Sequence, residues 1–138
     1  MTEASIRDRL VAALDGADGL VSVYLFGSVA TGRAHRESDV DLAVLLDRDL
    51  YPTPQHRFDL RLRLIGRLQS AIGRDVDLVV LNDAPPQLGR HIMTAGARLL
   101  VRDAERDHAH LRVTLSRAAD LEPFLRRTRA VKLRALSQ

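Results

Sequence analysis

The stretch that decides the fold of this chain is residues 21–46, which read VSVYLFGSVATGRAHRESDVDLAVLL. Two apolar runs of strand length flank a polar segment that contains glycines. In the second run Asp39 and Asp41 leave the same face of the strand, about 6.6 Å apart at roughly 3.3 Å per residue. Isolated carboxylates on an apolar strand are costly unless a cation compensates them. The strand carries neither Lys nor Arg, so the pair predicts a metal site, and hard oxygen ligands suit Mg²⁺.

The first apolar run ends at Gly27 and Ser28, which open a segment of small residues. A helix that starts there leaves backbone N–H groups free to bind an anion. Gly27 lets a phosphate group approach the backbone closely, and Ser28 adds a hydroxyl donor. A Gly-Ser pair after a strand is by itself usually only a turn. Combined with the acids, it predicts a site that holds phosphate at one end and metal at the other.

A third acid lies in residues 75–81, DVDLVVL, which read as another short apolar strand. Asp77 can supply a third ligand, and Asp75 competes with it for this role because both lie on the same strand face. These acids meet Gly27 and Ser28 at one sheet edge only if the first two strands are antiparallel and the third is parallel to the second. The intervening segment is long enough for the helical crossover that parallel neighbours need.

The remaining elements follow from apolar spacing and from the positions of glycine and proline. An amphipathic helix is predicted over residues 3–14. A second helix is predicted from apolar residues at helical spacing, namely Phe58, Leu62, Ile65, Leu68 and Ile72. Leu60 and Leu64 broaden this apolar stripe. Pro85 and Pro86 open a short helix that Gly96 ends, and residues 97–101 fit a fourth strand at a sheet edge. From Arg102 the chain is predicted to be helical, with an interruption near Pro123.

This order of elements predicts an α/β (α+β) fold, a small mixed β-sheet flanked by helices and followed by C-terminal helices. Residues 1–103 form the predicted core, and residues 104–138 form a helical extension of the same domain. With 138 residues and 46% hydrophobic content, one domain has enough apolar side chains for a core. No cysteine is present, which excludes a disulfide framework, and the five histidines show no ligand spacing and are expected at the surface or in loops. No apolar run approaches twenty residues, so we expect no membrane span and a cytoplasmic location.

Positive charge gathers near the C-terminus, at Arg126, Arg127, Arg129, Lys132 and Arg134. Such a stripe can bind nucleic acid, form a solvated helix face, or border a protein interface built on the neighbouring apolar residues. Aromatic residues make up only 4% of the chain and none is interleaved with this stripe. Direct nucleic-acid binding is therefore not favoured.

The pattern of Gly27-Ser28, ten intervening residues, Asp39-x-Asp41 and a later Asp77 resembles the DNA polymerase β-like nucleotidyltransferase superfamily. Within it, the short length is most similar to the minimal nucleotidyltransferases, which pair as antitoxins with HEPN-domain toxins. The resemblance is strongest over residues 20–82 and extends to about residue 103.

The resemblance implies a nucleotidyltransferase that moves AMP from ATP to a tyrosine of a cognate HEPN ribonuclease toxin, with which it forms a hetero-oligomer. Asp39, Asp41 and Asp77 would be catalytic and would hold two Mg²⁺ ions, and Gly27 and Ser28 would bind the nucleotide. Two alternatives remain open. One is a small-molecule nucleotidyltransferase of the aminoglycoside-modifying type, and the other is an antitoxin that masks its toxin by binding alone.

Overall fold

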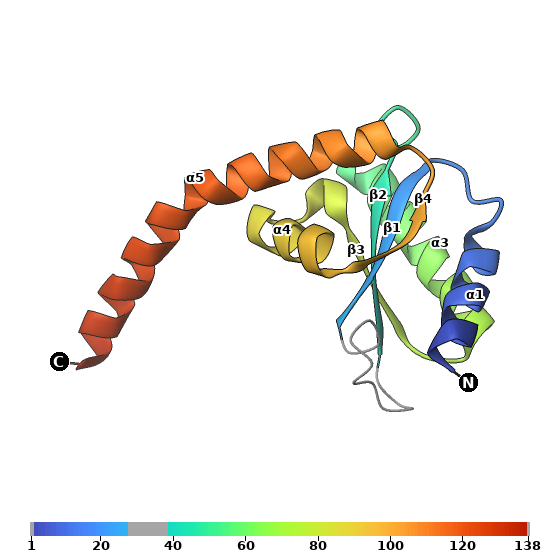
Figure 1. Ribbon diagram of the computed structural model, residues 1–138, viewed down its shortest axis with the longest axis horizontal. Coiled ribbons are helices and arrows are strands. Elements are labelled where there is room, and N and C mark those ends of the chain that lie inside the picture. Colours follow the sequence, from blue (N-terminus) through green and yellow to red (C-terminus); the bar gives the residue numbers. More distant parts are fainter. Residues whose placement is uncertain (1, 28–38, 138) are drawn as a thin grey trace.

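A four-stranded mixed sheet forms the centre of the molecule (Figure 1). Its strands lie in the order β3 (Val76–Val80), β2 (Val40–Leu46), β1 (Leu20–Phe26) and β4 (Ala97–Val101). β1 is antiparallel to β2 and β4, and β2 is parallel to β3. These pairings confirm the predicted strand directions and the edge position of the fourth strand. The computed structural model describes residues 2–27 and 39–137, with side chains to position 131.

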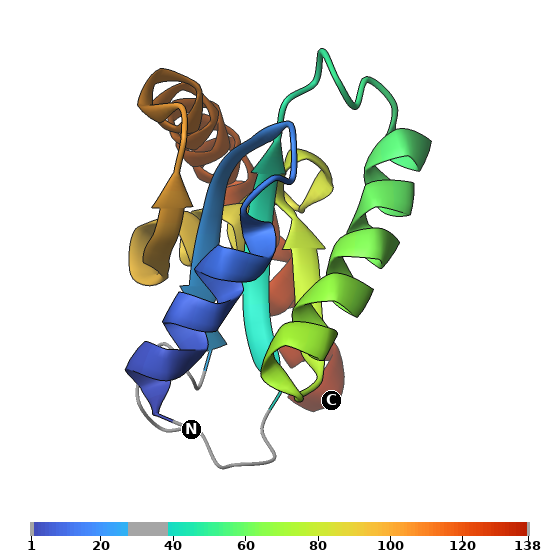
Figure 2. The ribbon, with the colours of Figure 1, turned by 90° about the vertical axis from the view of Figure 1, so that its right-hand side faces the viewer.

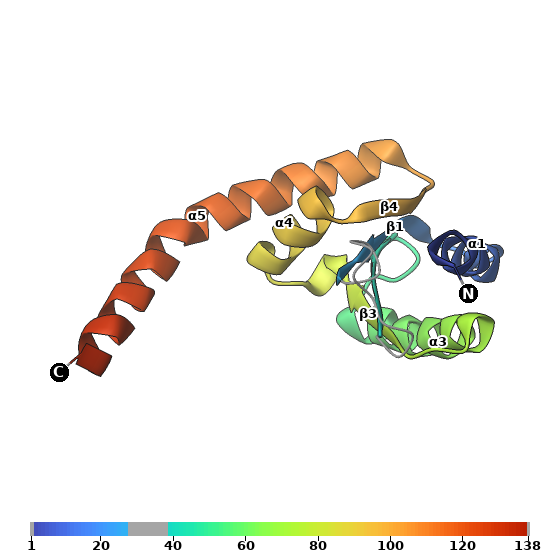
Figure 3. The ribbon, with the colours of Figure 1, turned by 60° about the horizontal axis from the view of Figure 1, so that its bottom comes forward.

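Helices cover both faces of this sheet (Figures 2 and 3). α1 (Glu3–Leu14) and α3 (Pro54–Ile72) lie on one face, where their buried side chains join those of the strands. α4 (Pro86–Ala95) and the first half of α5 (Ala104–Ser137) lie on the other face, and the short 3₁₀ helix η1 (Leu81–Asp83) links β3 to α4. The arrangement confirms the predicted fold class.

Local hydrogen bonds fix where the helices begin and end. The hydroxyl of Thr2 accepts a hydrogen bond from the backbone N–H of Ser5 at 3.1 Å, which caps α1. Thr53 caps α3 in the same way through the N–H of His56, also at 3.1 Å. α3 ends at Gly73, whose φ of +66° is a left-handed conformation that glycine adopts without steric cost.

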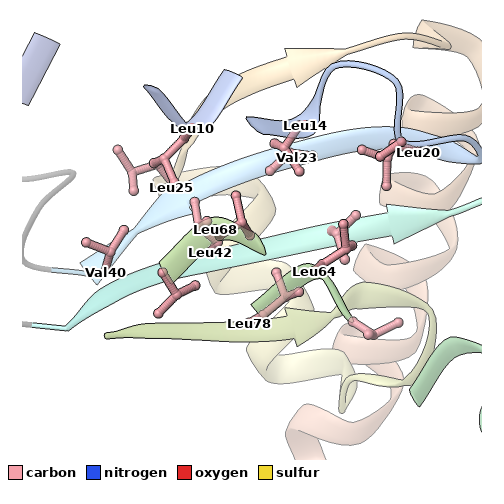
Figure 4. Close-up of a cluster of buried hydrophobic side chains, with 14 of the residues drawn as sticks. Leu10, Leu14, Leu20, Val23, Leu25, Val40, Leu42, Leu64, Leu68 and Leu78 are labelled. Atoms are coloured by element: carbon pink, nitrogen blue, oxygen red, sulfur yellow. The ribbon is translucent and has the colours of Figure 1, made fainter. Parts of the chain in front are cut away.

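The larger core cluster lies between the sheet and the pair α1 and α3 (Figure 4). α3 contributes the row Leu60, Leu64, Leu68 and Ile72 to this core. The predicted stripe was wrong in two members, because the side chains of Phe58 and Leu62 are 48% and 52% exposed. Residues two apart on a helix point about 200° away from each other, so the row of Leu60 and the row of Phe58 cannot both face the sheet.

α5 differs from its prediction in two respects. It continues through Pro123 as one helix, so the predicted interruption was wrong, and its axis bends near the middle (Figure 1). Proline removes one helical hydrogen bond and crowds the preceding turn, which kinks a helix without necessarily ending it. Beyond the bend, Phe124 and Val131 are 60% and 63% exposed. His110, expected at the surface or in a loop, is instead partly buried within this helix.

Two buried polar groups tie distant segments together. Asp107 on α5 is 1% exposed, and its Oδ1 accepts hydrogen bonds from the hydroxyls of Ser22 and Tyr24 on β1, both at 2.6 Å. Burial, followed by the hydrogen bond to Asp107, raises the pKa of Tyr24 to about 12. Near the other face, the guanidinium of Arg57 on α3 donates two hydrogen bonds of 2.8 Å to Asp83 in η1. Neither contact is evident from sequence pattern, because both join residues far apart in the chain.

Among the helices described, none combines the length and the apolar character that crossing a lipid bilayer requires.

Candidate active site

The predicted acids gather at one end of the sheet, on the face that carries α4. Asp41 on β2 is the direct register partner of Asp77 on the parallel strand β3, and of Phe26 on the antiparallel strand β1. Asp39 precedes β2 by one residue, so alternation along the strand puts it on the same face as Asp41. The structure thus forms a row of three carboxylates from two separate segments of the chain.

The backbone at Gly27 lies directly against this row. Gly27 follows the end of β1 and has a φ of +73°, a left-handed conformation that favours glycine. A β-carbon built at this position would lie only 2.1 Å from Oδ2 of Asp41 and 3.0 Å from its Cγ. Only glycine therefore lets the backbone approach Asp41 so closely. Ser28, the other predicted nucleotide-binding residue, lies outside the described residues.

The electrostatics of Asp41 reflect its crowded surroundings. Burial raises the pKa of its carboxyl group, and the negative charges of Asp77 and Asp39 raise the pKa further. A cation also lies close by, because Nη2 of Arg61 on α3 is 3.8 Å from Oδ1 of Asp77. Both of these side chains are partly exposed, at 30% and 59%, so water screens the pair. Burial and the neighbouring negative charges thus both disfavour the charged form of Asp41.

A divalent cation fits this donor set. Carboxylate oxygens are the ligands that Mg²⁺ prefers, and a cation would relieve the repulsion that raises the pKa of Asp41. Across residues 2–27 and 39–137, no three acidic or histidine side chains come close enough to enclose an ion by themselves. Mg²⁺ commonly takes one or two carboxylates and completes its coordination with water and substrate phosphates, so an open row is compatible with it. The candidates for holding the metal are Asp39, Asp41 and Asp77.

Asp75, the competitor for the third position, lies on the same strand face as Asp77 but two residues away from the register partner of Asp41. It precedes β3, its side chain is exposed, and its backbone carbonyl accepts a 2.9 Å hydrogen bond from the N–H of Val40. Asp77 contributes to the raised pKa of Asp41, and Asp75 does not. The geometry therefore favours Asp77 as the third acid.

A groove of about 550 Å³ opens beside Asp77, between α3, the edge strand β3 and the start of α4. Its walls include Arg61 and the exposed side chains of Phe58 and Leu88. Phe58 was expected in the core, and Arg61 carried no signal that set it apart from the other arginines of α3. Phe58 and Arg61 are three residues apart, so they lie on the same side of α3. Only the packing of α3 against the sheet shows that this side borders the groove.

Comparison with known proteins agrees with this geometry. The family model for polymerase beta, nucleotidyltransferase, matches residues 9–105, so the chain belongs to the polymerase β-type nucleotidyltransferase family. The chain is 39% identical over 85 residues to protein adenylyltransferase MntA of Shewanella oneidensis. That match covers 62% of this chain and 57% of the relative, so the chain spans little more than half of the length of this curated relative.

Two solved structures resemble this one over nearly the whole chain. A toxin–antitoxin crystal structure with AMP-PNP is 28% identical, with a TM-score of 0.68 and coverage of 96% of this chain and 98% of that chain. A structure of a tri-AMPylated Shewanella oneidensis HEPN toxin in complex with an MNT antitoxin is 25% identical, with a TM-score of 0.65. The latter match covers 99% of this chain and all of the chain compared.

Proposed function

We propose that this chain is an antitoxin with protein adenylyltransferase activity. It would transfer AMP from ATP to a tyrosine hydroxyl of a cognate HEPN ribonuclease toxin, and would form a complex with that toxin. The observation that carries the proposal is the register that sets Asp41 beside Asp77 and against Gly27. This arrangement combines a row of metal-binding oxygens with an exposed backbone turn, which is what transfer from a nucleoside triphosphate requires.

The comparisons support the donor and the acceptor named here. Family membership supports nucleotidyl transfer, and the resemblance to MntA supports AMP as the transferred group. The likeness to an antitoxin bound to an AMPylated HEPN toxin supports a toxin protein as the acceptor. The exposed apolar side chains of Phe124 and Val131 on α5 also favour a folded protein as the partner. We place the reaction in the cytoplasm, where ATP is available.

In this reaction the tyrosine oxygen bonds to the α-phosphorus of ATP, the bond from that phosphorus to pyrophosphate breaks, and the hydroxyl proton is released. We assign the phosphates to the backbone at Gly27 and to Ser28. Asp39, Asp41 and Asp77 would hold two Mg²⁺ ions, which when bound neutralise charge on the phosphates and on the leaving pyrophosphate. Asp77, the acid nearest the open groove, either completes this site or takes the proton.

The direct test is label transfer. The chain is incubated with Mg²⁺, with each of the four α-phosphate-labelled nucleotides in turn, and with the HEPN-domain protein encoded by the neighbouring gene. We expect label from ATP to appear on that protein, and replacing its acceptor tyrosine by phenylalanine abolishes labelling. The double variant Asp39→Asn with Asp41→Asn should lose at least 100-fold in rate. Asp75→Asn is the matched control and should keep nearly full activity, because Asp75 is not the register partner of Asp41 and does not contribute to its raised pKa.

Three results would overturn the proposal. Labelling of an aminoglycoside without any protein acceptor would favour a small-molecule enzyme. Full neutralisation of the toxin in cells by the double variant would favour masking by binding. Equal loss of activity in Asp75→Asn and in the double variant would contradict the assignment of the acids.

A further inference from the structure

A second cavity lies at the opposite end of the sheet from the carboxylates. It has a volume of about 330 Å³ and lies between η1, the start of α4 and the first half of α5. Arg48, which follows β2, contributes to its wall and is separated from Asp41 by about 20 Å along the strand, at roughly 3.3 Å per residue. This volume falls within the range of small-molecule sites. The cavity is therefore separate from the carboxylate row, although its wall meets the groove beside Asp77 at Ala84.

The charge on the wall of this cavity has one sign. Arg48, His110 and Arg117 contribute to the lining, and none of the side chains that line it is acidic. In the part of the chain that the structure describes, no carboxylate lies within 4.0 Å of the guanidinium of Arg48 or of Arg117. The first turn of α4 adds Pro86 and Gly89 to the wall, and the positive end of its helix dipole favours an anion.

The acids on either side of Arg48 in the sequence are already paired with another arginine. Arg106 on α5 forms ion pairs of 2.8 Å with Asp47 and of 3.4 Å with Asp49 and Asp103. These carboxylates are thus compensated from the neighbouring side of α5. Asp47 and Asp49 line the adjoining hollow together with Arg48, but neither carboxylate lies within 4.0 Å of its guanidinium.

We propose that this cavity is a second anion site, which binds the phosphate group of a small molecule such as inorganic phosphate, pyrophosphate or a nucleoside monophosphate. Two guanidinium groups present planar forks of N–H donors that match phosphate oxygens. Leu81 and Val113 line the rest of the cavity with apolar surface, which can accommodate a sugar or a base. The site is independent of the proposed transfer reaction, because it shares no residue with the carboxylate row.

His110 gives this site a spectroscopic reporter. Burial lowers the pKa of its imidazole, and the positive charges of Arg48 and Arg117 lower the pKa further. The carbonyl of Leu81, which accepts a hydrogen bond from the ring, and the charge of Asp107 act in the opposite direction. A bound anion would offset the two arginines and raise the pKa of His110. The affinity for an anion of constant charge should therefore increase as pH falls through this titration.

The test is an NMR titration of the whole chain without Mg²⁺, with the His110 signal assigned by the variant His110→Asn. Inorganic phosphate, pyrophosphate and AMP are added separately, and sulfate, whose charge is constant over this range, is used for the pH series. We expect saturable shifts of the His110 signal, and tighter sulfate binding at pH 5 than at pH 7, because the lowered pKa places this titration below 6.5. Tighter binding of AMP than of phosphate would identify a nucleotide site, and the reverse order would identify a site for free phosphate.

Variants locate the binding. Arg117→Gln and Arg48→Gln should each weaken phosphate binding at least tenfold. Arg112→Gln, an exposed arginine of α5 outside the cavity, is the matched control and should change the affinity less than twofold. The double variant Asp39→Asn with Asp41→Asn should bind phosphate as the natural chain does, whether or not AMP transfer exists. Absence of a saturable His110 shift, or equal affinity in Arg117→Gln and Arg112→Gln, would overturn the proposal.

Discussion

The contact between Gly27 and Asp41 makes Gly27→Ala the most informative single substitution in this chain. Alanine at a φ of +73° costs roughly 1–2 kcal/mol in backbone strain. In addition, the new β-carbon would lie 2.1 Å from Oδ2 of Asp41, more than 1 Å inside an ordinary contact, which begins at 3.4 Å. Either the carboxylate rotates away or the strand end shifts. A displacement of about 1 Å at a reacting centre can reduce the rate about 100-fold.

Gly73→Ala is a matched control for the strain of placing alanine in a left-handed backbone conformation. Gly73 has a φ of +66°, and a β-carbon there meets no atom within 4 Å. Both variants should lose about 1–2 kcal/mol of stability to backbone strain, roughly 3–7 °C in melting temperature for a domain of this size. Gly27→Ala should lose more than this, because its new β-carbon also meets Asp41. Only Gly27→Ala should lose AMP transfer, by about two orders of magnitude.

The two variants are compared by urea unfolding and by single-turnover labelling of the toxin at saturating ATP and Mg²⁺. Activity is expressed per folded molecule, so that the shared loss of stability does not enter the comparison. If Gly27→Ala transferred AMP as fast as Gly73→Ala, the close approach of the backbone to Asp41 would have no functional role and the reasoning would fail.

Two further predictions concern stability. The pKa of Asp41 is raised in the folded state, so the native chain binds more protons than the unfolded chain between the two pKa values, and stability falls as pH rises through this range. Asp41→Asn should therefore unfold at a higher urea concentration than the natural chain at pH 7. This gain in stability should disappear below about pH 4, near the pKa of the unfolded chain. No gain in stability at pH 7 would contradict the prediction. Asp107→Asn should lower the free energy of unfolding by about 2–3 kcal/mol, because the buried acceptor of two hydroxyl hydrogen bonds loses its charge. Tyr24→Phe should lower the free energy of unfolding less in the Asp107→Asn background than in the natural chain. Additive losses in urea unfolding would show that the hydrogen bond to Tyr24 carries no energy.

Much of the sheet was predictable from local pattern. Apolar runs of strand length, separated by turn residues, located the strands, and the requirement that the acids meet Gly27 determined their relative directions. That requirement is a strong constraint, because a strand in the wrong direction would send Asp77 to the far end of the sheet. The pairing of Asp41 with Asp77 agrees with it.

Other features depend on contacts that local pattern does not contain. Leu60 and Phe58 both fit a helical repeat, and the choice between their rows is made by the sheet that α3 covers. The acceptor role of Asp107 depends on β1, more than 80 residues away in sequence. The continuation of α5 through Pro123 is not evident from proline propensity, because a proline can kink a helix without ending it.

The outer half of α5 has a consequence for the life of the protein in the cell. Phe124 and Val131 face water on a segment that extends away from the sheet (Figure 1). A solitary helix that receives little packing energy opens readily, and open backbone is what proteases cut. Copies of the chain made in excess of a partner would be degraded first at this segment, while copies whose α5 is covered would persist. The abundance of the protein would then follow the supply of its partner, without any separate regulator.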